Sequence, residues 1–386
     1  MGNTLSFSVT PSEQRRASLI EAVSGIHVDP RGRADAIMTI VIASIYVFDL
    51  AAVVYMFFNR NYPPIRCKSP ILMTGVIVSS AIWFLGDLHI NGHVPLGDTP
   101  WNNCKAFAIW MSALLGVYTL SSLIAIRIFG LIRVFIVGQQ FRGRGLYLAL
   151  LLWAGSMLLY GLVVQFLPAE KTLFYVPLAD MCNSTKGLQA AIFAVIGSNW
   201  LVVLALGWYA RNIKSSFNEV LESAVGCFLI FLVLITSIVM HYSRPAFPLS
   251  AGYRIMVTCI DQSSTQIYWW IIMGVPLYNC LFRRERYLRE WTRKLMGDGL
   301  QKEYEVSDPG FSVNTTLVGR ASNAISMAPM PSPRHNDSHR GVNHLQTPII
   351  DHATSTENGE PISWPQLADY QQANEPPSSK HHIRRW

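Results

Sequence analysis

The sequence predicts an all-α integral membrane protein whose main part is a bundle of seven transmembrane helices. The 386 residues are 51% hydrophobic and only 14% charged, whereas an ordinary soluble domain carries roughly 25% charged residues. The apolar residues gather in seven blocks of about 20 residues, enough to cross ~30 Å of hydrocarbon as helices. The blocks lack the alternation of barrel strands. Buried helices of a soluble protein are the less favoured alternative, because seven such blocks separated by short polar loops are hard to place in one soluble core. Within lipid, only helices or closed barrels are possible.

The apolar blocks divide the chain into four parts. Residues 1–34 form an N-terminal segment without an apolar signal-peptide core, so we expect the first span to act as its own insertion signal. Residues 35–280 hold the bundle, and residues 281–296 form a short amphipathic helix after the seventh span. Residues 297–386 are rich in Ser, Asn, His and Pro without a helical period, which predicts a disordered tail. The predicted spans are 35–58, 70–90, 105–129, 146–167, 187–210, 222–242 and 253–280.

The distribution of Lys and Arg predicts the orientation of the bundle. The loops that are cytoplasmic when the N-terminus lies outside carry more Lys and Arg than the opposite loops, as cytoplasmic loops do. We therefore expect an extracellular N-terminus, a cytoplasmic C-terminus and a place in the plasma membrane. The opening "MGNTLS" fits an N-myristoylation pattern, which would need a cytosolic N-terminus. A cytosolic N-terminus conflicts with the Lys and Arg distribution, with the cysteine pair and with the loop 211–223, both described below. We therefore expect Gly2 to be unmodified.

Two cysteines lie on the predicted outer side, Cys104 before the third span and Cys182 in the loop after the fourth. In an oxidising compartment they can form a disulfide bond, although two unrelated free thiols are an equal alternative. The glycosylation sequon Asn183-Ser184-Thr185 directly follows Cys182 and predicts glycosylation at Asn183.

Several stretches resemble a known family of receptors. "RNIKSSFNEVLES" (211–223) resembles the third intracellular loop of class C G-protein-coupled receptors and of the plant and fungal seven-span proteins that carry a regulator-of-G-protein-signalling domain. "PWNNCKAFAIWMSALLG" and "RCKSP" are similar to the entries of the third and second spans in that group. The resemblance implies coupling to a heterotrimeric G protein. The chain departs from it in two ways, because 34 residues are too few for a large extracellular domain and the tail does not look like a regulator domain.

The resemblance and the charges near the inner loops give a candidate switch for G-protein coupling. We expect Glu219 to pair with Arg127 or Arg133 at the inner end of the third span in a resting state. A purely structural alternative is equally open, in which Ser216 and Glu219 form a capping box. Arg127 is expected at the inner interface with its head group reaching the membrane surface, and a place in a polar network is the less favoured alternative. The full set is Arg66, Lys68, Arg127, Arg133, Phe217, Asn218 and Glu219.

Polar side chains within the seventh span form a candidate ligand pocket. They are Asp261, Gln262 and Gln266, with Trp269 about one turn below. Polar groups within a span are costly in lipid and usually face the interior of a bundle. Ligand contact and hydrogen bonding between helices are equally open interpretations.

A basic amphipathic stretch follows the seventh span. Arg283, Arg284 and Arg286 provide cations, and Trp291 lies on its apolar side. We expect this helix to lie on the anionic inner surface of the membrane.

These patterns favour a receptor that passes an extracellular signal to a cytoplasmic G protein. A transporter or channel of unknown substrate is the alternative, although the halves show no internal repeat. Motifs of intramembrane enzymes are lacking, so we expect no enzymatic activity, cofactor or metal ion. The net charge of +7 lies mostly beside the spans, so it does not indicate nucleic-acid binding. The expected partners are a heterotrimeric G protein, membrane lipids and an unidentified extracellular ligand, and a homo-oligomer is left open.

Overall fold

The computed structural model describes residues 8–97, 103–135, 144–210 and 219–297. By contacts the chain divides into Met1–Val306 and Ser307–Trp386, and every described residue belongs to the first part. The predicted tail after Gly297 lies outside the described residues.

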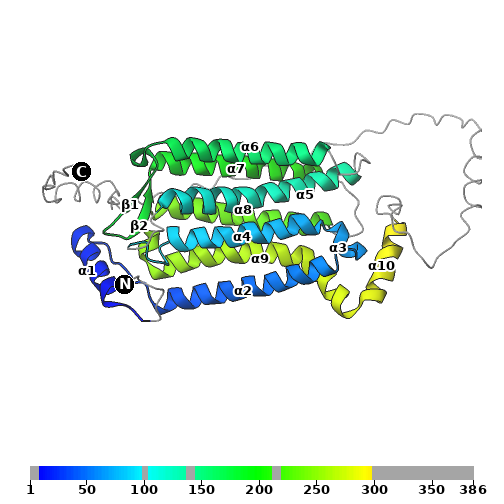
Figure 1. Ribbon diagram of the computed structural model, residues 1–386, viewed down its shortest axis with the longest axis horizontal. Helices are drawn as coiled ribbons and strands as arrows, with labels where there is room; N and C mark the ends of the chain where they lie inside the picture. The colour runs from blue at the N-terminus through cyan, green and yellow to red at the C-terminus, as the bar shows by residue number, and fades with distance from the viewer. Residues whose placement is uncertain (1–7, 98–102, 136–143, 211–218, 298–386) are drawn as a thin grey trace, which may run out of the picture. The chain divides into compact units, whose positions relative to one another are not determined.

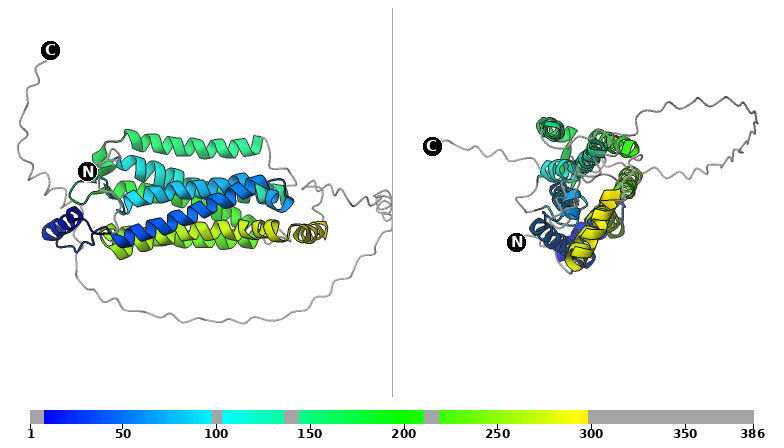
Figure 2. Two further views of the ribbon diagram at one scale, coloured as in Figure 1. Left: turned by 60° about the horizontal axis from the view of Figure 1, so that its bottom comes forward. Right: turned by 90° about the vertical axis from the view of Figure 1, so that its right-hand side faces the viewer.

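Long helices lie side by side and run up and down along a common direction (Figures 1 and 2). Their bounds are α2 Arg33–Phe58, α4 Pro70–Ile90, η1 Ala106–Tyr118 with α5 Thr119–Phe135, α6 Arg144–Phe166, α7 Lys186–Ala210, α8 Glu219–Ser243 and α9 Ala251–Phe282. In the described residues, six helices are long and apolar enough to cross a membrane, and α9 is not among them. The helix ends agree closely with the predicted spans, except that α5 continues to Phe135.

The outward surface of the bundle is apolar, as expected for a membrane protein. Val47 on α2 is 69% exposed and Leu151 on α6 is 68% exposed. A helix on the surface of a soluble protein would turn polar residues outward at such positions. The many exposed Leu, Val and Phe side chains of α2, α6, α7 and α8 therefore fit a surrounding of lipid.

Two of the long helices, α4 and η1, approach each other very closely. η1 is a π-helix, a form that usually appears only as a single turn. A Cβ added at Gly86 would lie 2.8 Å from the backbone nitrogen of Ser112, and one at Gly116 would lie 2.7 Å from Cβ of Trp83. The two glycines thus let the backbones touch, as small residues do between membrane helices.

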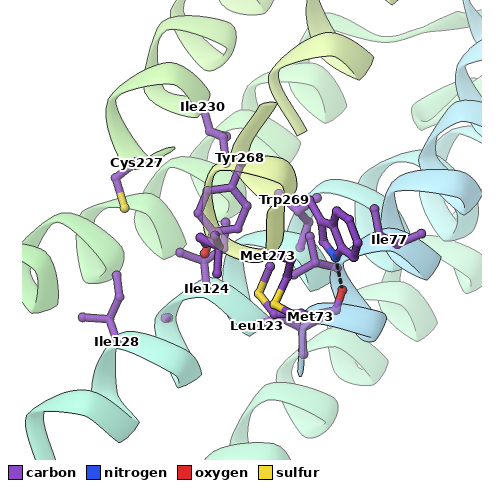
Figure 3. Packing of buried hydrophobic residues seen from close by; sticks show 14 of the residues in the cluster. Met73, Ile77, Leu123, Ile124, Ile128, Cys227, Ile230, Tyr268, Trp269 and Met273 are labelled. Atoms are coloured by element: carbon purple, nitrogen blue, oxygen red, sulfur yellow. Dashed lines mark hydrogen bonds between the residues drawn. The ribbon is translucent and has the colours of Figure 1, made fainter. Parts of the chain in front are cut away.

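The apolar core lies between α2, α4, α5, α7, α8 and α9. Figure 3 shows its central part, where Tyr268, Trp269 and Met273 of α9 face Met73 of α4 and Ile124 of α5. The indole nitrogen of Trp269 donates a hydrogen bond to the backbone oxygen of Met73 at 3.0 Å. The donor of this large side chain is therefore satisfied inside the core.

One end of the bundle, here called the disulfide end, carries the N-terminal helix and a β-hairpin (Figure 1). Helix α1 (Pro11–Ser24) begins after the cap Thr10 and stops at Gly25, whose φ is 67°. The antiparallel strands β1 (Leu173–Val176) and β2 (Met181–Ser184) follow the short η2 (Ala169–Lys171). Another short turn, η3 (Phe247–Leu249), precedes α9.

The predicted disulfide bond is confirmed at this end. Cys104 at the start of the third long helix is bonded to Cys182 of β2, with their Cα atoms 5.6 Å apart. The bond ties the hairpin to the bundle.

The opposite end, here called the α10 end, carries α3 (Pro63–Cys67) and α10 (Arg284–Gly297) (Figure 1). Tyr62, just before α3, donates a hydrogen bond from its hydroxyl to the backbone oxygen of Arg284 at 3.0 Å. Burial raises the pKa of the Tyr62 hydroxyl to about 12, so the group stays protonated and able to donate.

Candidate functional site

At the disulfide end, a buried cluster joins the start of α2 to α9 through the loop after α4. We call Asp35, His93, Arg254, Thr258 and Asn91 the Asp35 cluster. Arg254 donates two hydrogen bonds to the Asp35 carboxylate, from Nε at 2.7 Å and from Nη2 at 2.6 Å. Such a two-point contact between a guanidinium and a carboxylate is both strong and specific in geometry. His93 is fully buried and Arg254 is 1% exposed.

The hydrogen bonds of the Asp35 cluster fit a neutral His93. Nδ1 of His93 lies 2.7 Å from Oδ1 of Asp35, and Nε2 lies 2.9 Å from Oγ1 of Thr258. Because the carboxylate can only accept, Nδ1 carries the proton. Asn91 donates to Oγ1 of Thr258 at 2.9 Å, which leaves the Thr258 proton for Nε2. Every one of these contacts is therefore satisfied when His93 is neutral.

A second cluster ties the N-terminal segment to the hairpin. Arg31 donates to the Asp180 carboxylate at 2.6 Å and to its backbone oxygen at 2.8 Å. The same carboxylate accepts from the backbone of Gly97 at 2.6 Å and from the hydroxyl of Tyr175 at 2.7 Å. In α1, Arg16 donates to the backbone oxygen of Ala179 at 2.9 Å. The N-terminal segment is thus a fitted part of the disulfide end.

A polar layer crosses the middle of the bundle between α2, α4 and α9. The hydroxyl of Tyr46 donates to Oε1 of Gln262 at 2.6 Å, and Nε2 of Gln262 donates to Oδ2 of Asp87 at 3.3 Å. Ser112 of η1 donates to the other oxygen of Asp87 at 3.1 Å. Ser80 and Thr265 are joined at 2.7 Å. This layer is the hydrogen-bonded linkage of helices that the sequence left open for Gln262.

The other predicted pocket residues are also buried in α9. Asp261 accepts from Ser237 of α8 at 3.4 Å, and Trp269 donates to Met73 as described above (Figure 3). Gln266 is buried near Asp49, whose Oδ1 accepts from the indole of Trp270 at 3.0 Å. Ligand binding by these residues stays a prediction.

A cavity of about 390 Å³ lies elsewhere, on the side of the bundle between α7 and α8. Its lining is almost entirely apolar and includes Phe193, Gly197, Trp200, Leu204 and Phe231. None of the four predicted pocket residues contributes to it.

At the α10 end, an ion pair links the start of α4 to α8. Nζ of Lys68 lies 2.6 Å from Oε2 of Glu222, and both side chains are largely shielded from water. The sequence analysis placed Lys68 in the coupling set but expected the acidic group of the switch to be Glu219, one helical turn before Glu222, paired with Arg127 or Arg133. The side chain of Glu219 lies outside the described residues, as do Phe217 and Asn218. Their predicted roles therefore remain predictions.

Arg127 does not reach a surface, contrary to the favoured one of its two predicted placements. It is 4% exposed and lies beside Tyr268 of α9 and Cys227 of α8. The reason is that α5 occupies a central place in the bundle, so this face of the helix meets protein. Arg133 is half-buried near Gly145, and Arg66 is exposed at the end of α3.

Helix α10 differs from the predicted orientation in its apolar face. Trp291 is buried, and Tyr287 and Leu288 pack against the core of the bundle. Helix α10 therefore turns its apolar face toward the bundle, and its place on the membrane surface stays a prediction. Arg283, Arg284 and Arg286 are exposed, with Arg284 stacked 5.4 Å above the ring of Tyr62.

The contacts of Asp35 with Arg254 and of Arg31 with Asp180 are absent from the sequence-based expectations. Asp35 is the first residue of the predicted first span, and Arg254 is the second residue of the predicted seventh span. The sequence did indicate that such contacts exist, since an ionisable residue within a span usually pairs with a group of opposite charge. The partner could not be chosen, because Asp35 and Arg254 are 219 residues apart in the chain.

No group of three or more His, Cys, Asp or Glu side chains able to hold a metal ion occurs in the residues that the structure describes. Compared with known proteins, the sequence matches no protein-family model and no curated protein. The functional interpretation therefore depends on the residues themselves.

Proposed function

We propose that the chain is a seven-span receptor that passes a signal from the disulfide end to a heterotrimeric G protein at the α10 end. In this proposal the disulfide end faces outward and the α10 end faces the cytoplasm of a cell, at its plasma membrane. The Lys68–Glu222 ion pair carries the proposal, because it closes the end that bears the loop resembling a G-protein-coupling segment.

We propose α9 as the seventh span, although its composition is more polar than that of the other long helices. Its exposed positions include Ile267, Val275 and Leu281, whereas Asp261 and Gln262 are buried. A helix with apolar residues outside and polar residues inside is suited to lipid, where polar groups must find partners within the bundle. The polar residues that lower its hydropathy are thus the ones that join it to α2, α4 and α8.

The ion pair offers a two-state element for signalling. Lys68 precedes α4 and Glu222 lies in the first turn of α8, so the pair holds two helices together at the α10 end. Opening of this end would separate the two charges and expose a site for a partner. A ligand shifts such an equilibrium only by binding one state more tightly than the other.

Nucleotide exchange on purified G proteins tests the proposal. The full chain is placed in lipid nanodiscs and mixed with heterotrimeric G proteins of several classes and a slowly hydrolysed GTP analogue. We expect Lys68→Ala and Glu222→Ala each to raise basal exchange several-fold, because each breaks the pair that holds the closed state. We expect the charge-swapped double variant Lys68→Glu with Glu222→Lys to restore the low basal rate of nucleotide exchange.

The matched control is Arg286→Ala, which removes an exposed pair with Glu290 and leaves the basal rate unchanged. Lack of exchange with every G protein, in the wild type and in both single variants, would refute the receptor proposal. A flux of ions or small solutes through reconstituted vesicles would instead favour the transporter or channel.

A further inference from the structure

We propose that the Asp35 cluster is a proton-binding site, in which protonation of His93 releases the N-terminal segment from α9. The ligand of this site is a hydrogen ion from the medium at the disulfide end. The inference rests on the proposed function only for the side of the membrane that this end faces.

The Asp35 cluster is balanced in charge when His93 is neutral. Asp35 contributes one negative charge from α2 and Arg254 contributes one positive charge from α9, and His93 lies in contact with Asp35 beside Arg254. A proton that binds Nε2 of His93 brings the cluster to a net positive charge. Because His93 and Arg254 are almost completely buried, the added charge is not solvated, and such a charge is costly.

Protonation also disturbs the hydrogen bonds. Nε2 changes from an acceptor to a donor, so the Thr258 hydroxyl can no longer donate to it. Thr258 already accepts from Asn91, and its own proton then needs another acceptor. The loop that carries His93 has little freedom to adapt, since the backbone nitrogen of His93 donates to Leu88 and that of Leu96 donates to Asp180.

Release from the Asp35 cluster would free a defined stretch of chain. Arg254 also donates to the backbone oxygen of Asp29 at 3.1 Å, and Asp29 accepts from the first residue of α9, Ala251, at 2.9 Å. The stretch 25–35 is therefore held at the start of α9 at several points, and Arg254 contributes the contacts with the Asp29 backbone and with Asp35. Besides Asp35, this stretch carries two other ionisable groups, His27 and Asp29, which are more exposed and lie 3.5 Å apart.

The sign of the pH dependence follows from linkage. Burial, together with the positive charge of Arg254, lowers the pKa of His93 below its ordinary value of 6.5, against the opposite influence of Asp35 and of a hydrogen bond with the Arg254 backbone. The released state then binds the proton more tightly than the closed state. Closure is fully favoured above about pH 6.5 and weakens as the pH falls below it. Between about pH 7.5 and about pH 5.5, the opening equilibrium rises about tenfold if the closed state binds no proton.

Hydrogen–deuterium exchange of the full chain in nanodiscs tests the inference. Exchange of the backbone amides in residues 25–36 is measured at about pH 7.5 and about pH 5.5 and corrected for the intrinsic pH dependence of exchange. We expect the opening equilibrium of this segment to increase about tenfold from about pH 7.5 to about pH 5.5 in the wild type. In His93→Gln we expect no change between the two pH values. The matched control is His27→Gln, which keeps the response because His27 is exposed and outside the cluster.

Two results would overturn the inference: no increase in the wild type, or an equal increase in His93→Gln. If that variant does not fold, the wild-type curve still decides. A rise of one decade per pH unit starting near 6.5 supports His93, whereas a rise confined to about pH 4 indicates carboxylates instead. No G protein takes part in this measurement, so its failure and the failure of the receptor proposal are separable.

Discussion

At the scale of single residues, the molecule places ionised groups where water does not reach and gives them partners. Asp35 and Arg254 are the clearest example, because the carboxylate accepts both bonds of the guanidinium fork. A buried ion pair is expensive to form but far more expensive to break on one side. The condition for stable packing of α2 against α9 at the disulfide end is therefore that both partners of the pair are present.

Removal of one member of the pair tests this condition. Arg254→Met leaves the Asp35 carboxylate without its main partner, and we expect a loss of about 3–5 kcal/mol in the free energy of unfolding. The midpoint of thermal unfolding in detergent measures the change. Arg286→Met is the control, because Arg286 and Glu290 are 73% and 52% exposed and such surface pairs contribute about 0–1 kcal/mol. Equal midpoints for Arg254→Met and the wild type would contradict the prediction.

At the scale of elements, the contact between α4 and η1 depends on the lack of a side chain. Gly116 faces Cβ of Trp83, and the two helices cannot separate without losing the hydrogen bond between Ser112 and Asp87. Close packing and the polar layer thus depend on the same pair of helices.

An added methyl group at this contact tests its tightness. Gly116→Ala places a Cβ 2.7 Å from that of Trp83, and we expect overpacking to cost about 1–3 kcal/mol. Gly155→Ala on α6 is the matched control, because no atom lies within 4 Å of its added Cβ and alanine favours helix by up to about 1 kcal/mol. Thermal unfolding midpoints compare the two. A Gly116→Ala protein as stable as Gly155→Ala would show that the helices can move apart freely.

The disulfide bond is the element that fixes the hairpin. Its cysteines are 78 residues apart, and loss of a disulfide that closes a long loop costs about 2–5 kcal/mol. We therefore expect Cys104→Ser to lower the unfolding midpoint to that of the reduced wild type, and a reductant to have no further effect on the variant. Cys259→Ser, which replaces a free cysteine, serves as the control. Insensitivity of the wild type to reductant would contradict this expectation.

The helices could be predicted from the sequence because their signal is local. Twenty consecutive apolar residues determine a long helix, and α4 occupies the predicted 70–90. The partners inside the bundle could not be predicted, since Lys68 pairs with Glu222 and Asp35 with Arg254 across long stretches of chain. Arg127 shows the same limit, because its burial depends on the central place of α5 among neighbours that no periodicity specifies.

At the scale of the whole described part, the two ends differ in chemistry. The disulfide end is held by a covalent bond, a hairpin and two buried charged clusters, whereas the α10 end is closed by the Lys68–Glu222 pair and the packing of α10. In the receptor proposal, this difference lets the α10 end rearrange while the disulfide end stays closed. Protonation of His93 would remove this asymmetry.

The pairing of Asp35 with Arg254 also has a consequence for biogenesis. The two residues are 219 positions apart, and a ribosome that adds about 5–20 residues per second needs between about 10 and about 40 s to make the intervening chain. During this interval the start of α2 is already made, and the Asp35 carboxylate lacks its partner Arg254. A nascent chain that is truncated before α9 keeps a carboxylate at the start of α2 that lacks this partner.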